Sequence, residues 1–98
     1  MGARATPHDA ADEGQVRERF AAEGLRPQSW SNGPGDRYPW HSHGYDKILY
    51  CVRGSIVFRT RDDAEHRMRA GDRLDIDAGT EHAADLGPDG VTCMEAPR

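Results

Sequence analysis

The chain has 98 residues, of which 36% are hydrophobic and 31% are charged. This length allows one compact domain with a small core, and 13 basic against 17 acidic side chains give a net charge of −4, which argues against a nucleic-acid-binding surface. The sequence has neither an apolar run long enough to span a bilayer nor the apolar segment of a secretory signal. We therefore expect a cytoplasmic protein that binds neither nucleic acid nor membrane.

The first 24 residues predict a tail followed by one short helix. Thr6 suits a helix N-cap, and Pro7 suits the first helical position. Gly24 is a natural helix stop, and residues 1–8 are expected to be mobile. We assign residues 1–24 to a tail and a helix that packs on a domain formed by residues 25–98.

The remaining residues predict short strands separated by turns. Runs of strand-forming residues recur at intervals of about 8–12 residues, which is typical of an all-β sandwich or barrel. Glycine-containing breaks such as Arg53-Gly54 and residues 87–90 are predicted to be turns. Eight strands are expected, at residues 25–30, 37–43, 47–52, 55–61, 65–69, 72–76, 82–86 and 91–96.

His41 and His43 are the first chemical signal in the sequence. Side chains two residues apart on a strand leave the same face. Two imidazoles in this arrangement can converge on one metal ion at about 2.0–2.1 Å. The same pair is also compatible with surface histidines on an exposed strand.

Seven glycines and histidines recur at the spacings of the two sequence motifs of the cupin superfamily, and the pattern over residues 35–86 resembles that family. The resemblance implies an all-β, double-stranded β-helix (jelly-roll) barrel with a short N-terminal helix. It also implies one divalent transition metal ion held by His41, His43 and His82, and the donors do not select among Fe, Ni, Zn, Cu and Mn. A barrel that holds three histidines and no metal is the alternative. The matching residues are Gly35, His41, His43, Gly54, Gly71, Gly79 and His82.

The chain departs from this pattern where the family's carboxylate ligand is expected, because that position holds Lys47, the only lysine. Beside a metal ion, the lysine would have to deprotonate, pair with a carboxylate such as Asp46 or Glu81, or extend to solvent. As a catalytic residue, Lys47 would anchor an anionic substrate or act as an acid/base. Asp46 is an alternative oxygen ligand, although strand alternation turns it away from His43.

These features predict a metal-binding protein, with a metal-dependent dioxygenase acting on a small organic substrate as the leading hypothesis. A non-redox isomerase or lyase, and a non-catalytic module that binds a small ligand or metal, are the alternatives. The substrate is expected to be a small molecule. The positive charge of Lys47 would favour an anionic one. Polar strand edges and the helix are compatible with a homodimer. Cys51 and Cys93 are interpreted as small buried hydrophobic residues, with a bridge as the minor alternative.

Overall fold

Two long, bent strands organise the fold. The computed structural model describes residues 2–98, and the single ten-residue helix in this part of the chain is too short to cross a membrane. In chain order, the elements of residues 2–98 are β1 (Ala3–Thr6), α1 (Glu13–Ala22), β2 (Gln28–Asn32), β3 (Arg37–His41), β4 (Lys47–Thr60), β5 (Glu65–Arg69), β6 (Arg73–Ile76) and β7 (His82–Pro97).

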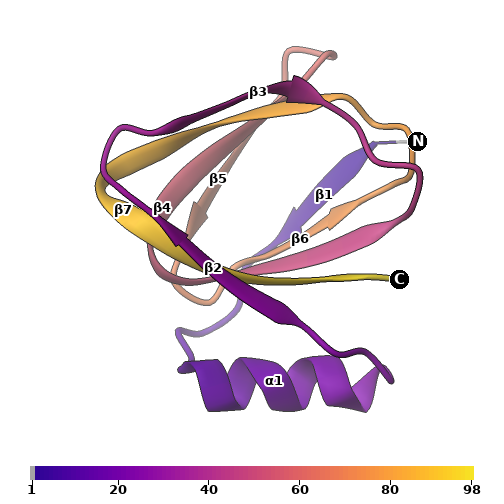
Figure 1. Cartoon of the computed structure of the whole chain (residues 1–98), viewed down its shortest axis with the longest axis vertical. Coiled ribbons are helices and arrows are strands. Elements are labelled where there is room, and N and C mark those ends of the chain that lie inside the picture. Colours follow the sequence, from indigo (N-terminus) through magenta and orange to yellow (C-terminus); the bar gives the residue numbers. More distant parts are fainter. Residues whose placement is uncertain (1) are drawn as a thin grey trace.

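The strands form an antiparallel jelly-roll barrel, as the sequence predicted. The main sheet order is β1-β6-β4-β7-β2, with β3 paired to β7 and β5 paired to β4. The first half of β4 pairs with β6 and the end of β7, and the second half pairs with β5 and the start of β7. Because β4 and β7 run through both halves, they join the two layers around one interior (Figure 1).

The predicted turns at Arg53-Gly54 and residues 87–90 are wrong, because β4 and β7 continue through them. Register shifts in the β4–β7 pairing occur just after Cys51 and just after Gly54, so the strands bend at bulges without ending. Gly54 has φ +76°, and a Cβ there would lie 2.1 Å from the carbonyl oxygen of Gly90. This bend therefore requires glycine both for its conformation and for the close approach of the two strands.

The predicted helix start is also wrong, and part of the predicted tail forms a strand. Residues 3–6 form β1, which pairs antiparallel with β6 and covers an edge of the sheet. The helix begins later, because Asp12 and not Thr6 is its N-cap. Asp12 accepts from the backbone N–H of Gln15, whose side chain accepts in return from the Asp12 backbone. The sequence alone did not show that a free strand edge was available to residues 3–6.

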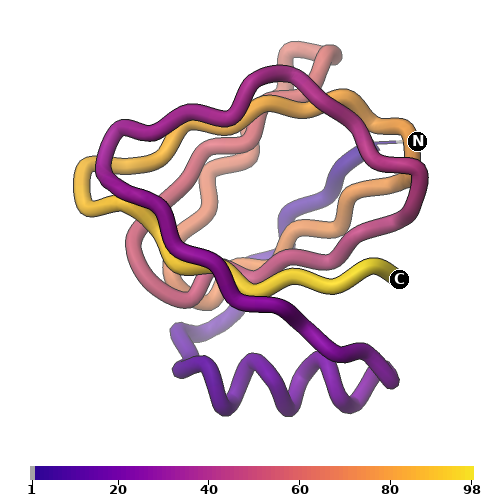
Figure 2. The backbone as a smooth tube through the Cα atoms, in the orientation of Figure 1, coloured from indigo at the N-terminus to yellow at the C-terminus, as the bar shows by residue number. Residues whose placement is uncertain are grey.

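Apolar side chains form two separate clusters, one inside the barrel and one between the sheet and the helix. Figure 2 shows α1 lying outside the barrel, and Val16 and Phe20 are its fully buried residues. They pack on Ile48, Tyr50, Val52, Met94 and Ala96 from the outer faces of β4 and β7. The interior cluster contains Leu49, Cys51, Ile56, Phe58, Met68, Leu74, Ile76, Ala84, Leu86, Val91 and Cys93.

Candidate metal centre and cavity

The structure brings the three predicted histidines together at one end of the barrel. His41 ends β3 and pairs in register with His82 at the start of β7, and His43 lies just beyond β3. The ring centres of His41 and His82 are 4.3 Å apart, and that of His43 lies 5.0 and 5.2 Å from them. One ring nitrogen from each histidine lies within 4.8 Å of the other two.

Backbone carbonyls orient two of the three rings. Nδ1 of His41 lies 2.7 Å from the carbonyl oxygen of Pro39, and Nδ1 of His82 lies 2.9 Å from that of Thr80. Because a carbonyl can only accept, each Nδ1 carries the proton and donates it, which leaves a lone pair on Nε2. This is the arrangement in which metal-binding histidines are held in proteins.

The third ring presents a nitrogen without a partner. Nε2 of His43 is buried and makes no hydrogen bond within the described residues. A buried polar atom without a partner is costly unless another group satisfies it. Together with the free Nε2 lone pairs of His41 and His82, this nitrogen forms a donor set that fits a transition metal ion.

Burial keeps His43 and His82 in the form that a metal requires. Desolvation lowers the pKa of His43, and the nearby positive charge of Lys47 lowers it further. Desolvation also lowers the pKa of His82, more strongly than its bond to Thr80 raises it. Both rings are therefore neutral near pH 7, with lone pairs available for coordination.

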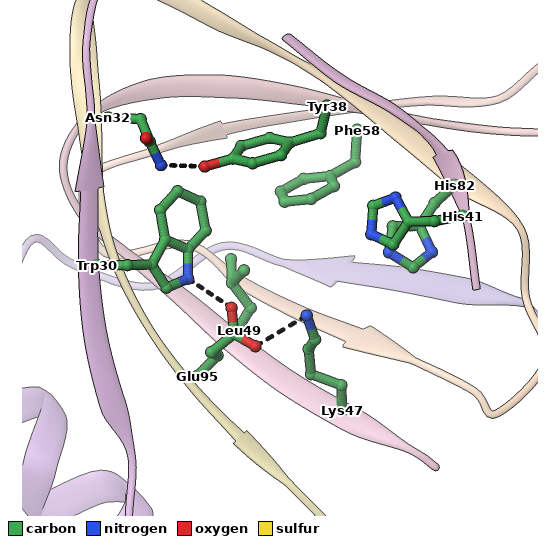
Figure 3. Close-up of a pocket in the computed structure, with 9 residues that line it drawn as sticks. All are labelled: Trp30, Asn32, Tyr38, His41, Lys47, Leu49, Phe58, His82 and Glu95. Atoms are coloured by element: carbon green, nitrogen blue, oxygen red, sulfur yellow. Dashed lines mark hydrogen bonds and ion pairs between the residues drawn. The ribbon is translucent and has the colours of Figure 1, made fainter. Parts of the chain in front are cut away.

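A cavity of about 250 Å³ opens inside the barrel beside the histidines. Pockets for drug-sized ligands typically have volumes of about 300–1,000 Å³, so this cavity suits a smaller molecule. Aromatic and aliphatic side chains alternate around its wall with polar and charged groups (Figure 3). The lining residues are Trp30, Asn32, Tyr38, His41, Lys47, Leu49, Phe58, His82 and Glu95.

Lys47 points into this cavity, and only 9% of its side chain is exposed. Its Nζ lies 2.8 Å from Oε2 of Glu95 on β7. The other carboxylate oxygen of Glu95 accepts a hydrogen bond from the indole of Trp30 (Figure 3). Lys47 therefore pairs with a carboxylate, which is one of the three arrangements considered from the sequence. Its partner is Glu95 and not Asp46 or Glu81.

Those two acids have other partners. The carboxylate of Asp46 accepts from the backbone N–H of Ala78 at 2.7 Å, and Asp46 is not in the histidine cluster. The alternative that Asp46 is a fourth ligand is therefore wrong for this structure, as strand alternation indicated. Glu81 forms an exposed ion pair with Arg61 at 3.1 Å.

Sequence reasoning missed Glu95 and the aromatic cavity wall. Glu95 was the one charged residue in the apolar run of residues 91–96, and a charge inside a buried strand is an available signal for a functional site. Trp30, Tyr38 and Phe58 gave no such signal, because aromatic residues on strands usually pack in the core.

Solved structures of similar fold include characterised and uncharacterised proteins. A structure described as "DMSP lyases RdDddP and RnDddQII" matches with TM-score 0.70 and 26% identity over 76% of this chain and 38% of that chain. A cupin-2 domain protein from Shewanella frigidimarina matches with TM-score 0.64 and 21% identity over 76% and 71% of the two chains. A DUF861 family protein from Thermotoga maritima matches with TM-score 0.68 and 9% identity over 98% and 99%.

The first of these comparisons covers only part of the matched protein, since this chain spans about 38% of the lyase chain. The two less identical structures show the shared fold alone. No curated protein matches the chain. The family model of the cupin domain matches residues 30–88, which is more than half of the chain and includes all three clustered histidines. Together with the jelly-roll topology, this match shows that the chain belongs to the cupin family.

Proposed function

We propose that this cupin binds one divalent transition metal ion and acts as an enzyme on a small organic molecule. His41, His43 and His82 would hold the ion. The observation that carries the proposal is the convergence of three imidazole rings, one of which has a buried nitrogen without a partner, at a cavity that also holds an ion pair.

The charges of the cavity support this assignment. Three neutral imidazoles leave a bound divalent ion with its full charge, and a positively charged Lys47 without a partner would repel this ion. Glu95 at 2.8 Å compensates the charge of that lysine. A negative substrate group would then offset part of the metal's remaining charge, which supports a small anion as the substrate.

Lys47 and Glu95 supply the groups that proton transfer requires. An ammonium has three N–H donors, of which Glu95 uses one, so Lys47 retains donors for a substrate carboxylate. A carboxylate can accept about four hydrogen bonds, and Glu95 is seen to accept two, so it retains sites to take up a proton. When bound, the metal would polarise a substrate oxygen as a Lewis acid. These roles favour a lyase or isomerase reaction, and the likeness to the DMSP lyases supports that class.

A dioxygenase is the second candidate, and the set of three histidine ligands favours it. The site lacks a carboxylate donor among its clustered residues, and some cupin dioxygenases also use three histidines without a carboxylate. The two classes differ in the metal they need, because zinc cannot change its redox state.

Metal binding is tested first, with protein purified without an affinity tag and then stripped with a chelator. Titration with Zn(II) or Co(II) should show one equivalent bound, and His82→Ala should weaken the affinity at least about 100-fold because one of three ligands is lost. His66→Ala is the matched control, since His66 lies on β5 outside the cluster. Equal affinities for the two variants would refute the proposed ligands.

Turnover is tested next, with Zn(II)- and Fe(II)-loaded protein on DMSP and a panel of small carboxylates. Product formation with Zn(II) and no oxygen consumption supports the lyase or isomerase class. Oxygen consumption that requires Fe(II) supports the dioxygenase. Saturable ligand binding without turnover by either form would indicate the non-catalytic module. The homodimer and the cytoplasmic location stay predictions.

A further inference from the structure

Two cysteines lie directly opposite each other inside the barrel. Cys51 on β4 and Cys93 on β7 are register partners in the antiparallel pairing of these strands. Both are free thiols, and both have no exposed surface. They are the only cysteines of the chain, so each is the sole thiol partner available to the other within one molecule.

The backbone hydrogen bonds show which kind of strand pair these cysteines form. The N–H of Cys51 donates to the carbonyl of Asp72, and the carbonyl of Cys51 accepts from the N–H of Gly71. Both backbone groups of Cys51 thus point away from β7, so Cys51 and Cys93 form a non-hydrogen-bonded pair. Cα atoms in such pairs are about 4.5 Å apart, and disulfides span about 4.4–6.8 Å between Cα atoms.

The cysteine pair lies one layer below the cavity. Leu49 on β4 and Glu95 on β7 are register partners that both line the cavity. Cys51 and Cys93 follow two residues away on the same strands, and alternation places them on the same inward face. Trp30 on β2, which also lines the cavity, is the register partner of Cys93. A small molecule inside the cavity is therefore separated from the thiols by the side chains of one layer.

The Cys51 thiol lies beside two backbone carbonyls and opposite the Cys93 thiol. Its Sγ is 3.6 Å from the carbonyl oxygen of Arg53 and 3.7 Å from that of Gly54. The neighbouring Cys93 thiol lowers the pKa of Cys51, and the neighbouring Cys51 together with burial raises the pKa of Cys93. We therefore expect Cys51 to react first, because the thiolate is the reactive form, and Cys93 is its register partner.

We propose that Cys51 and Cys93 form a reversible oxidation site, in which a small peroxide that enters the cavity converts the pair to a cross-strand disulfide. The Cys51 thiolate attacks one peroxide oxygen and breaks the O–O bond, which gives a sulfenic acid and hydroxide. The Cys93 sulfur then attacks the sulfenic sulfur, and the sulfenic hydroxyl leaves with the Cys93 proton as water. Two thiols lose two electrons and two protons, and hydrogen peroxide is reduced to two waters.

The test uses the full-length, chelator-treated protein and hydrogen peroxide as the probe. After a few equivalents of peroxide, the native protein is quenched, unfolded, alkylated and weighed by mass spectrometry. We expect the loss of two hydrogen atoms and no alkylation, with a peptide that links Cys51 to Cys93 and full reversal by dithiothreitol. Because the link closes a loop of about 40 residues, the oxidised protein should also melt about 10 °C or more above the reduced protein.

Two single-thiol variants, Cys51→Ala and Cys93→Ala, are the controls, with circular dichroism to verify that each folds. The Cys93→Ala variant should trap a sulfenic acid on Cys51, which dimedone labels, and Cys51→Ala should react more slowly. Should a variant fail to fold, the wild-type mass and melting measurements decide by themselves. Two alkylatable thiols after peroxide treatment, added oxygen in place of the link, or a disulfide between molecules would each overturn the proposal.

This proposal does not depend on the proposed metal function, because every measurement uses metal-free protein. A protein that binds no metal and still forms the link would retain the oxidation site and lose the proposed enzyme activity. A metal-binding protein whose thiols resist peroxide would show the reverse.

Discussion

The ion pair between Lys47 and Glu95 should contribute measurably to stability. At 2.8 Å, the attraction between two unit charges is about 6 kcal/mol with an effective dielectric constant near 20. Desolvation of the two charges offsets much of this attraction, and removal of one partner of a buried pair typically costs about 3–5 kcal/mol. The Glu95 side chain is 22% exposed, so water can partly solvate an unpaired lysine, and we expect Glu95→Gln to cost about 2–3 kcal/mol. Glutamine keeps an acceptor for the Trp30 indole, so the change isolates the charge.

A double-mutant cycle with Lys47→Met tests this number. In the double variant no buried charge is left without a partner, so the two losses should be less than additive by about 1.5–2 kcal/mol. Urea unfolding of chelator-treated protein gives the four free energies, provided that the m-values agree. The exposed pair Arg61–Glu81, at 3.1 Å, is the matched control, with an expected coupling below about 1 kcal/mol. A Lys47–Glu95 coupling under about 0.5 kcal/mol would refute the electrostatic reasoning.

Two further predictions concern the histidines and the strand bend. Because burial lowers the pKa of His43 and of His82 in the folded protein, the unfolded chain binds protons more readily, so the metal-free protein should lose stability as the pH falls below about 6.5. Thermal unfolding between about pH 5 and 8 measures this slope, and the slope should flatten when both residues are replaced by glutamine; an unchanged slope would assign the effect to other groups. Gly54→Ala should cost about 2 kcal/mol or more, because the added Cβ meets the Gly90 carbonyl at a positive φ. Gly24→Ala, at φ +74° with open space around it, should cost only about 1 kcal/mol, and equal losses in urea unfolding would contradict the close-approach argument.

Local sequence signals predicted the type of fold but not where its strands end. Alternating residues and regularly spaced turn residues indicate strands, because strand geometry is local. A glycine, however, permits a turn, a bulge or a close approach equally well. At Gly54 and Gly90 the outcome is a close approach of two strands, because β4 and β7 pair on both sides of the bulge. The same reason explains β1, whose partner β6 lies about 70 residues further along the chain.

The histidine positions were predictable for a different reason. His41 and His43 are close in sequence, and the spacing of His82 relative to its glycines resembles a known motif, so the cluster could be inferred from the sequence. The position and partner of Lys47 could not be inferred in this way. Its surroundings depend on Glu95, which is 48 residues away and has no sequence signal that names its partner.

The sequence by itself therefore determined an all-β cupin barrel, a three-histidine constellation and an unusual lysine. Only the tertiary structure decided that this lysine faces the cavity, that Glu95 neutralises it, and that Cys51 meets Cys93. The physical reason is that the strand register sets which side chains oppose each other across β4 and β7. Register depends on the bulges and on the packing of the whole sheet, and these are properties of the folded chain and not of any segment within it.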